Sequence, residues 1–174
     1  WLSPLIGNAE PRCPRMEGDT LRYFQPVMLP LPSTPAVDLQ ACLERQRAHF
    51  LADPMSGLAE RRARLQQLAR FVRDHQDALC EAINADYGHR SRHETLLAEI
   101  VPVLDGIKDT SRRLRRWMKP QRRAVDRLVF GLASNRVVPQ PVGVVGVIVP
   151  WNFPLNLSFV PLTAILAAGN RAMV

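Results

Sequence analysis

The stretch "GVVGVIVPWNFPL", residues 143–155, decides how the carboxyl-terminal part of this chain folds. Its first half is a continuous run of valine, isoleucine and glycine, which is typical of a parallel strand covered on both faces. Two prolines then enclose a tryptophan and an asparagine, a composition that marks a loop. The sequence therefore predicts a buried strand over residues 142–149 and a loop over residues 150–154.

The residues after this loop have the pattern of a helix followed by a second strand. The span 155–168 is long enough for a helix, in which Pro161 introduces a kink. Gly169 suits the left-handed end of that helix, and residues 171–174 begin another strand. We therefore expect an α/β fold in which an N-terminal helical segment leads into the first βαβ unit of a doubly wound, Rossmann-like domain, truncated after that unit.

Asn152 lies at the carboxyl end of the first predicted strand, where doubly wound sheets bind their ligands. Its side-chain NH2 group is a neutral donor that suits the stabilisation of a developing oxyanion. Its side-chain oxygen could equally cap the following helix, and the residues alone leave these two interpretations evenly balanced. Gly143 and Gly146 lie within the strand rather than after it, so they do not form a phosphate-binding G-x-G-x-x-G turn.

Residues 36–126 have the apolar periodicity of a helical region. The predicted N-caps of four successive helices are Asp38, Ser56, Asp74 and Ser91. In the second helix, apolar residues from Leu58 to Val72 form one stripe, and the arginines are expected to face away from it. Pro102 is expected to bend the last helix.

The residues before this region read as a leader. Residues 1–35 are rich in proline and show neither helical nor strand periodicity, so we expect them to be poorly ordered, and Met28 offers a natural start. The chain contains three cysteines without a CxxC pair. We interpret Cys13, Cys42 and Cys80 as reduced thiols of a cytoplasmic protein.

Charge leaves two other classes of function open. The chain has a formal net charge of +7, and basic residues dominate Arg112 to Arg127, as a helical nucleic-acid-binding module would require. We favour a solvated helix end, where cations complement the helix dipole, and no nucleic-acid partner. Residues 137–170 contain no charged residue, as a membrane-associated protein would require. Prolines and asparagines divide them too often for stable membrane insertion.

Two histidines have a spacing that could indicate a metal site. His89 and His93 are four residues apart, the spacing of two ligands on one helix face. Gly88 and Ser91 place His89 at a helix boundary instead, so we expect no metal site.

Residues 140–174, "QPVGVVGVIVPWNFPLNLSFVPLTAILAAGNRAMV", closely resemble the start of the coenzyme-binding domain of the aldehyde dehydrogenase superfamily. The resemblance covers residues 36–174, and "PWNFP" with "AAGN" at its proper distance is specific. The position of Pro161 and the short helical region are similar to the class 3 branch. Within that branch, "LQACLERQRAHFLADP", "ADYGHRSRHETLLAEI" and "LRRWMKP" are similar to the bacterial coniferyl aldehyde dehydrogenases.

The resemblance implies an enzyme that oxidises an aldehyde substrate to its acid with NAD or NADP, through a cysteine thiohemiacetal and a thioester. It implies that Asn152 donates to the thiohemiacetal oxygen. The residues implied to line the coenzyme are Ile148, Val149, Pro150, Trp151 and Asn152. Residues 127–141 would supply the oligomerisation strands of a homodimer, and residues 142–174 would begin the NAD(P)-binding domain.

Other parts of the family's pattern have no counterpart in this sequence. They are a Lys-x-Ser-Glu segment that holds the coenzyme ribose, a glycine-rich turn, the general-base glutamate and the nucleophilic cysteine. None of the three cysteines lies in a context that matches the nucleophile. The resemblance therefore implies an N-terminal fragment that is catalytically inactive alone.

Overall fold

The structure is a computed structural model that describes residues 38–174, so the expectations for the leader, Met28 and Cys13 lie outside the described residues. The helical region comprises α1 (Leu39–Ala52), α2 (Leu58–Asp74), α3 (Gln76–Tyr87), α4 (Arg92–Thr95), the π-helix η2 (Leu96–Ile100) and α5 (Val101–Trp117). It is followed by β1 (Gln121–Arg123), α6 (Arg127–Phe130), β2 (Asn135–Val137), β3 (Val144–Gly146), α7 (Pro154–Ala168) and β4 (Arg171–Met173).

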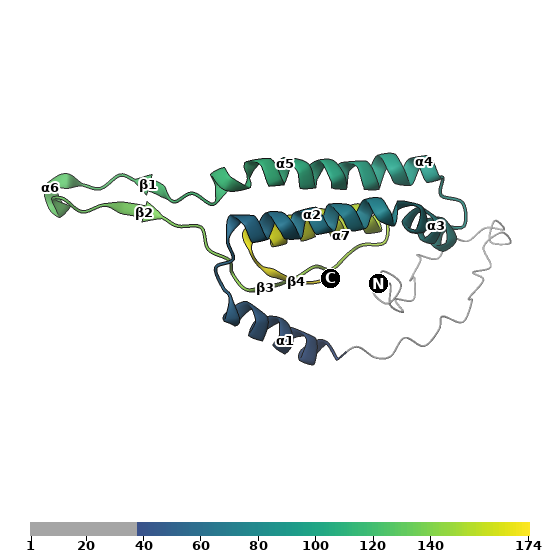
Figure 1. Cartoon of the computed structure of the whole chain (residues 1–174), viewed down its shortest axis with the longest axis horizontal. Coiled ribbons are helices and arrows are strands. Elements are labelled where there is room, and N and C mark those ends of the chain that lie inside the picture. Colours follow the sequence, from purple (N-terminus) through teal and green to yellow (C-terminus); the bar gives the residue numbers. More distant parts are fainter. Residues whose placement is uncertain (1–37) are drawn as a thin grey trace, which may run out of the picture.

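The core lies where α2, α5 and α7 pack against one another (Figure 1). Leu65 of α2, Ile100 of η2 and Leu114 of α5 are fully buried there. Burial of one such side chain contributes about 1.5–3 kcal/mol, so the apolar stripes of these helices hold the core together. Helix α7 belongs to this core although it is predicted to belong to the sheet domain. The helical region and the βαβ unit therefore share one core.

The predicted βαβ unit is present. Strand β3 pairs in parallel with β4, with Val144 opposite Arg171 and Gly146 opposite Met173, and α7 connects the two strands. Helix α1 contacts both strands as well, and it lies beside them and apart from the other helices (Figure 1). Gly169 ends α7 in the left-handed conformation, at φ 87°, as predicted.

The first strand of this unit is shorter and less buried than predicted. It was expected over residues 142–149 with both faces covered, but β3 spans only Val144–Gly146. Val142 is 82% exposed and Ile148 is 100% exposed. The reason is that β3 has one partner strand among the described residues, so no second neighbour extends the ladder or covers its ends.

Two of the four predicted N-caps are confirmed. The Asp38 carboxylate accepts from the Ala41 N–H at 3.0 Å, and the Ser91 hydroxyl accepts from the Glu94 N–H at 3.1 Å. The other two predictions are wrong. The N-cap residue of α2 is Gly57, not Ser56, and no side chain caps this helix. Asp74 is the last residue of α2 and not the N-cap of α3. Because Asp74 is still helical, it cannot adopt the extended conformation that an N-cap requires.

The last long helix does not begin as one regular α-helix. The π-helix η2 separates α4 from α5, and Pro102 follows one residue into α5. Proline has no N–H to offer the carbonyl four residues earlier, which belongs to Ala98. That carbonyl accepts instead from Nδ2 of Asn156 in α7, at 2.9 Å. The bend expected at Pro102 stays a prediction, and what the structure shows there is a change of hydrogen-bond pattern that links this helix to α7.

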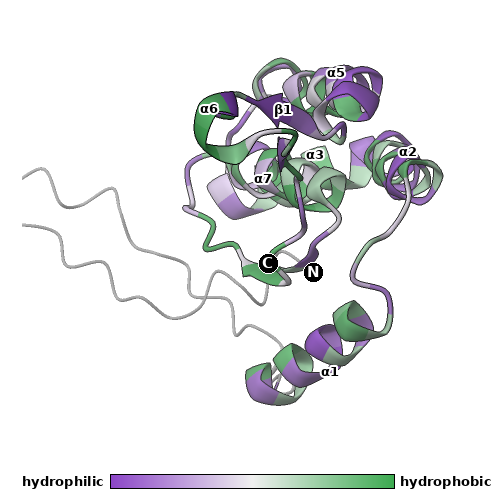
Figure 2. Ribbon diagram, turned by 90° about the vertical axis from the view of Figure 1, so that its left-hand side faces the viewer, coloured by the Kyte–Doolittle hydropathy of each residue, from purple (hydrophilic) through white to green (hydrophobic). Residues whose placement is uncertain are grey.

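A hairpin projects from the end of α5, away from the core (Figure 1). Its antiparallel strands pair Gln121 with Val137 and Arg123 with Asn135. Of the strands expected within residues 127–141, β2 lies in that range, whereas β1 precedes it. Residues 127–130 form the short helix α6 instead, since Asp126 caps them through the N–H groups of Leu128 and Val129. Figure 2 shows an apolar α6 beside a hydrophilic β1.

No helix in the described part of the chain is sufficiently long and apolar to span a bilayer. Residues 137–170, which lack charge, are divided between β3, α7 and the loops around them.

Candidate functional site

The loop between β3 and α7 carries all the residues that the sequence proposes for a site. Ile148 is 100% exposed and Trp151 is 73% exposed. Val149 is half-buried, and Pro150 and Asn152 are exposed. These side chains form an apolar run that ends in a carboxamide, at the carboxyl end of a parallel strand. In a doubly wound sheet this is the position at which ligands bind.

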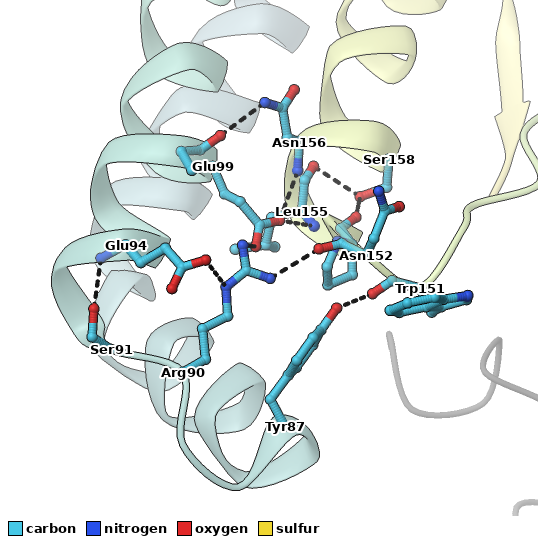
Figure 3. Close-up of polar contacts among 12 residues, drawn as sticks. Tyr87, Arg90, Ser91, Glu94, Glu99, Trp151, Asn152, Leu155, Asn156 and Ser158 are labelled. Atoms are coloured by element: carbon cyan, nitrogen blue, oxygen red, sulfur yellow. Dashed lines mark hydrogen bonds and ion pairs between the residues drawn. The ribbon is translucent and has the colours of Figure 1, made fainter.

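Helix α7 begins without help from its own loop. Its N-cap residue is Phe153, and no side chain of that loop accepts a hydrogen bond from the first turn. The cap comes from Glu99 in η2, whose Oε2 accepts from the N–H of Leu155 at 2.6 Å and from the N–H of Asn156 at 3.1 Å (Figure 3). A carboxylate at a helix N-terminus satisfies two unpaired donors and complements the helix dipole.

Glu99 is fully buried, and its environment acts on its pKa in two directions. Burial raises the pKa of the Glu99 carboxyl, while the hydrogen bonds from Asn156 and Leu155 and the charge of Arg90 oppose this rise. The net direction is upward. Burial therefore makes the ionised form of Glu99 costly, and the N–H groups of Leu155 and Asn156 and the charge of Arg90 offset part of that cost.

Arg90 connects this carboxylate with the loop. Its Nη2 lies 3.2 Å from Oε1 of Glu99, and its Nη1 donates to the backbone carbonyl of Asn152 at 3.0 Å (Figure 3). The Arg90 side chain is only 5% exposed. Its guanidinium carbon lies 5.0 Å from the ring centroid of Tyr87 and 4.8 Å from that of Phe153, distances at which a cation is attracted to a ring.

The backbone of the loop is thus held on both sides of the Asn152 side chain. The Tyr87 hydroxyl donates to the carbonyl of Trp151, and Arg90 holds the next carbonyl along the chain. The Asn152 carboxamide itself makes no hydrogen bond with any residue of the described part of the chain, and it does not cap α7. Of the two interpretations that the sequence leaves open, the geometry excludes the capping role.

The sequence matches the Aldehyde dehydrogenase family over residues 24–174. The chain belongs to the aldehyde dehydrogenase family. It is 54% identical over 136 residues to a probable coniferyl aldehyde dehydrogenase of Pseudomonas aeruginosa, covering 78% of this chain and 28% of that protein. It is 40% identical over 139 residues to the coniferyl aldehyde dehydrogenase of Pseudomonas sp. strain HR199, covering 80% and 28%.

Solved aldehyde dehydrogenases share the fold. The chain matches a substrate-bound AldH of Staphylococcus aureus with a TM-score of 0.72 and 25% identity, covering 77% of this chain and 29% of that one. It also matches the G224D mutant of a Bacillus cereus aldehyde dehydrogenase with a TM-score of 0.68 and 26% identity, covering 78% and 27%. The Rossmann-like fold class is confirmed. The chain spans about 28% of the length of the curated relatives it matches.

The described residues of this chain fit only part of what a nicotinamide coenzyme would require. The N–H groups at the start of α7 are held by Glu99, so this helix end is not a free phosphate site. The exposed run from Ile148 to Trp151 fits the other requirement of such a coenzyme, which is apolar contact with a flat ring. The apolar residues from Ile148 to Trp151 therefore fit the ring of NAD or NADP, whereas the start of α7 does not fit its phosphates.

The cysteines of the described residues do not resemble catalytic thiols. Cys80 is buried in the core, and burial raises the pKa of its thiol, whereas a nucleophilic cysteine requires a lowered pKa. Cys42 lies on α1 and is a free thiol. Within residues 38–174 no group of three or more His, Cys, Asp or Glu side chains could hold a metal ion.

Sequence reasoning missed the two charged residues that hold α7. Arg61 was expected to face away from the apolar stripe of α2, but it is buried and donates to the carbonyls of Ala167 at 3.2 Å and Ala168 at 2.8 Å. Its spacing gave a signal, because Arg61 precedes the buried Leu65 by four residues and therefore shares its helix face. Glu99 likewise precedes the buried Val103 by four residues.

Proposed function

We propose that this chain supplies the oxyanion-stabilising asparagine, Asn152, and one wall of the coenzyme site of an NAD- or NADP-dependent aldehyde dehydrogenase. The observation that carries the proposal is that Glu99 caps α7 while the Asn152 carboxamide stays exposed. An exposed amide on a backbone fixed by Tyr87 and Arg90 is a pre-oriented donor. Pre-orientation is what makes such a donor effective in a transition state.

In the proposed reaction, a cysteine thiolate adds to the aldehyde carbonyl carbon and the carbonyl oxygen becomes an oxyanion. The Asn152 NH2 group donates to that oxygen and stabilises the charge as it develops. NAD or NADP, which the residues from Ile148 to Trp151 would hold, would supply the acceptor for the hydride that leaves the carbon. A glutamate base then activates water, which releases the acid from the thioester.

The thiolate and the base are proposed to come from outside the printed sequence. The buried Cys80 has the wrong pKa direction for a nucleophile, and Glu99 is engaged in capping α7. Each of the curated relatives above is covered for only 28% of its length. We therefore propose that the 174 residues alone do not turn over aldehydes.

The role of Asn152 is tested in the protein expressed from its complete reading frame. We expect Asn152→Ala to lower kcat by about a hundredfold to a thousandfold with little change in the KM for the coenzyme, because a transition-state donor is lost. Asn84→Ala is the matched control, since Asn84 is an exposed asparagine of α3, and its kcat should stay within about twofold of the parent. A kcat for Asn152→Ala equal to that of this control would refute the proposal.

The proposed substrate is an aromatic aldehyde of the coniferyl type. The support is that the two Pseudomonas relatives, at 54% and 40% identity, are a probable coniferyl aldehyde dehydrogenase and a coniferyl aldehyde dehydrogenase. We expect kcat/KM to be highest for coniferyl aldehyde, lower for other aromatic aldehydes and lowest for medium-chain aliphatic aldehydes, with NAD and NADP compared in parallel. A clear preference for aliphatic aldehydes would reject this substrate class and leave the role of Asn152 intact.

A further inference from the structure

We infer that Glu99 is a positioning residue that keeps Asn152 available as a donor by occupying the N–H groups that Asn152 would otherwise cap. This inference rests on the proposed function of Asn152. It assigns to the helical region a part in the chemistry of the loop, beyond the support of the fold.

Competition for the start of α7 is the first step. Asparagine is among the best N-cap residues, and Asn152 lies directly before the N-cap Phe153. If Asn152 became the cap, its side-chain oxygen would need the N–H of the second or third residue after it. The second is Pro154, which has no N–H. The third is Leu155, whose N–H donates to Glu99 at 2.6 Å. Asn152 is therefore left without a backbone donor to accept from.

The second step is the clamp on the loop backbone. Glu99 contacts Arg90, and Arg90 donates to the Asn152 carbonyl, so one buried pair holds both the start of α7 and the backbone of Asn152 (Figure 3). Tyr87 holds the Trp151 carbonyl beside it. The side chain of Asn152 is then the part of this loop segment that is left to face a ligand.

The third step is the cost of this arrangement. A fully buried carboxylate is expensive, and a serine or aspartate in the loop would cap α7 without that cost. A cap delivered from η2 stabilises the helix no better than a local one. It differs in leaving the loop asparagine unengaged, which is the property that the proposed chemistry needs.

A double-mutant cycle of Glu99→Gln and Asn152→Ala tests the inference in the full-length enzyme. We expect Glu99→Gln to lower kcat by about tenfold to a hundredfold with little change in KM, because a neutral amide is a weaker acceptor for the N–H groups of α7 and Asn152 can then compete for them. In the Asn152→Ala background the same change should have no further effect on kcat. Glu94→Gln is the control, since Glu94 also contacts Arg90, at 3.5 Å, but is exposed and does not cap α7. Its kcat should stay within about twofold.

Thermal unfolding of the same four proteins gives a readout independent of activity. In the parent, Asn152 caps nothing, so Asn152→Ala should leave Tm unchanged. In the Glu99→Gln background Asn152 becomes the cap, and Asn152→Ala should then lower Tm by roughly 2 °C more. If Glu99→Gln does not fold, the cycle is run with Glu99→Asp, whose shorter carboxylate cannot reach both N–H groups.

The outcomes separate the inference from the function on which it rests. Equal effects of the Glu99 substitution on kcat in both Asn152 backgrounds, with equal Tm effects of Asn152→Ala, would overturn the positioning role and leave the role of Asn152 in place. An Asn152→Ala enzyme with parental kcat would overturn the proposed function, whatever the Tm cycle shows.

Discussion

At the residue scale, the buried Glu99 is the group whose ionisation has the largest consequence for the site. It is the acceptor for the first turn of α7 and the counter-charge of Arg90. The first turn of α7 is distant in the chain, because Leu155 follows Glu99 by 56 residues. Changes at this one side chain should therefore be felt both in stability and in the loop that carries Asn152.

The pH dependence of stability tests the balance of forces on Glu99. Because burial raises the pKa of this carboxyl above 4.5, the folded protein binds its proton more tightly than the unfolded chain does. The stability that protonation provides is present below the unfolded pKa and is lost as pH rises through the folded pKa. We expect the free energy of unfolding of the parent, minus that of Glu99→Gln, to fall over that range.

Urea unfolding at steps between about pH 4 and pH 8 measures this difference. The Glu94→Gln protein serves as the control for removing a carboxylate that contacts Arg90 but is exposed rather than buried. A difference that rises with pH would mean that Arg90 and the two backbone N–H groups outweigh burial, so the pKa direction would be the reverse.

At the element scale, α7 has no charged residue of its own, and other helices supply a negative charge at its N-terminus and a positive charge at its C-terminus. Glu99 lies at its N-terminus, and Arg61 donates to the carbonyls at its C-terminus. Both charges complement the helix dipole, which is positive at the N-terminus and negative at the C-terminus. Burial is the main cause that lowers the pKa of Arg61. The guanidinium still stays protonated near neutral pH, so the hydrogen bonds that it donates to α7 do not depend on pH there.

The left-handed end of α7 should be intolerant of a side chain. Gly169 has φ 87°, and a Cβ there would lie 2.6 Å from Cζ of Arg61. We expect Gly169→Ala to lower the free energy of unfolding by about 2–4 kcal/mol, from backbone strain and the displaced Arg61 hydrogen bonds. Denaturant unfolding measures the loss.

A second glycine provides the comparison for this substitution. Gly106 lies within α5, and a Cβ there has no neighbour within 4 Å. Gly106→Ala should raise the free energy of unfolding by about 0.5–1 kcal/mol, since alanine loses less backbone entropy in a helix. If both substitutions had the same effect, the contact between Gly169 and Arg61 would not be the cause.

The elements that sequence patterns located best are those whose signals are local. The span of α7, its glycine end and the caps at Asp38 and Ser91 all depend on neighbouring residues. The failures at Ser56 and Asp74 arose because a polar residue beside a helix has the composition of a cap whether or not it accepts a hydrogen bond. The π-helix η2 has no compositional signature, so it could not be predicted.

At the scale of the whole molecule, the hairpin exposes apolar side chains that no other described part of the chain covers. Leu128 is 97% exposed and Leu132 is 105% exposed, and Phe130 beside them is 63% exposed. Clustered apolar residues at a projecting tip are typical of a surface that pairs with another chain. The homodimer implied by the resemblance stays a prediction, and this tip is where we expect its contact.

Oligomeric state tests that prediction. We expect sedimentation velocity to give a dimer for the full-length parent, and Leu128→Asp combined with Leu132→Asp to give a monomer, because burying two carboxylates opposes association. Leu39→Asp is the control, since Leu39 is 66% exposed at the start of α1, and it should remain dimeric. A double variant that sediments with the parent would place the interface elsewhere.

The sequence by itself determined the βαβ unit and the loop that carries Asn152, because apolar periodicity and turn residues are properties of neighbouring positions, and its resemblance to known sequences indicated the family. Only the tertiary structure decided that Asn152 does not cap α7. The free N–H groups at the start of a helix can donate to any nearby acceptor, and the free carbonyls at its end can accept from any nearby donor. In α7 the acceptor is Glu99, 56 residues before Leu155, and the donor is Arg61, 106 residues before Ala167. Packing alone brings them there, and it leaves the Asn152 side chain without a role as the cap of α7.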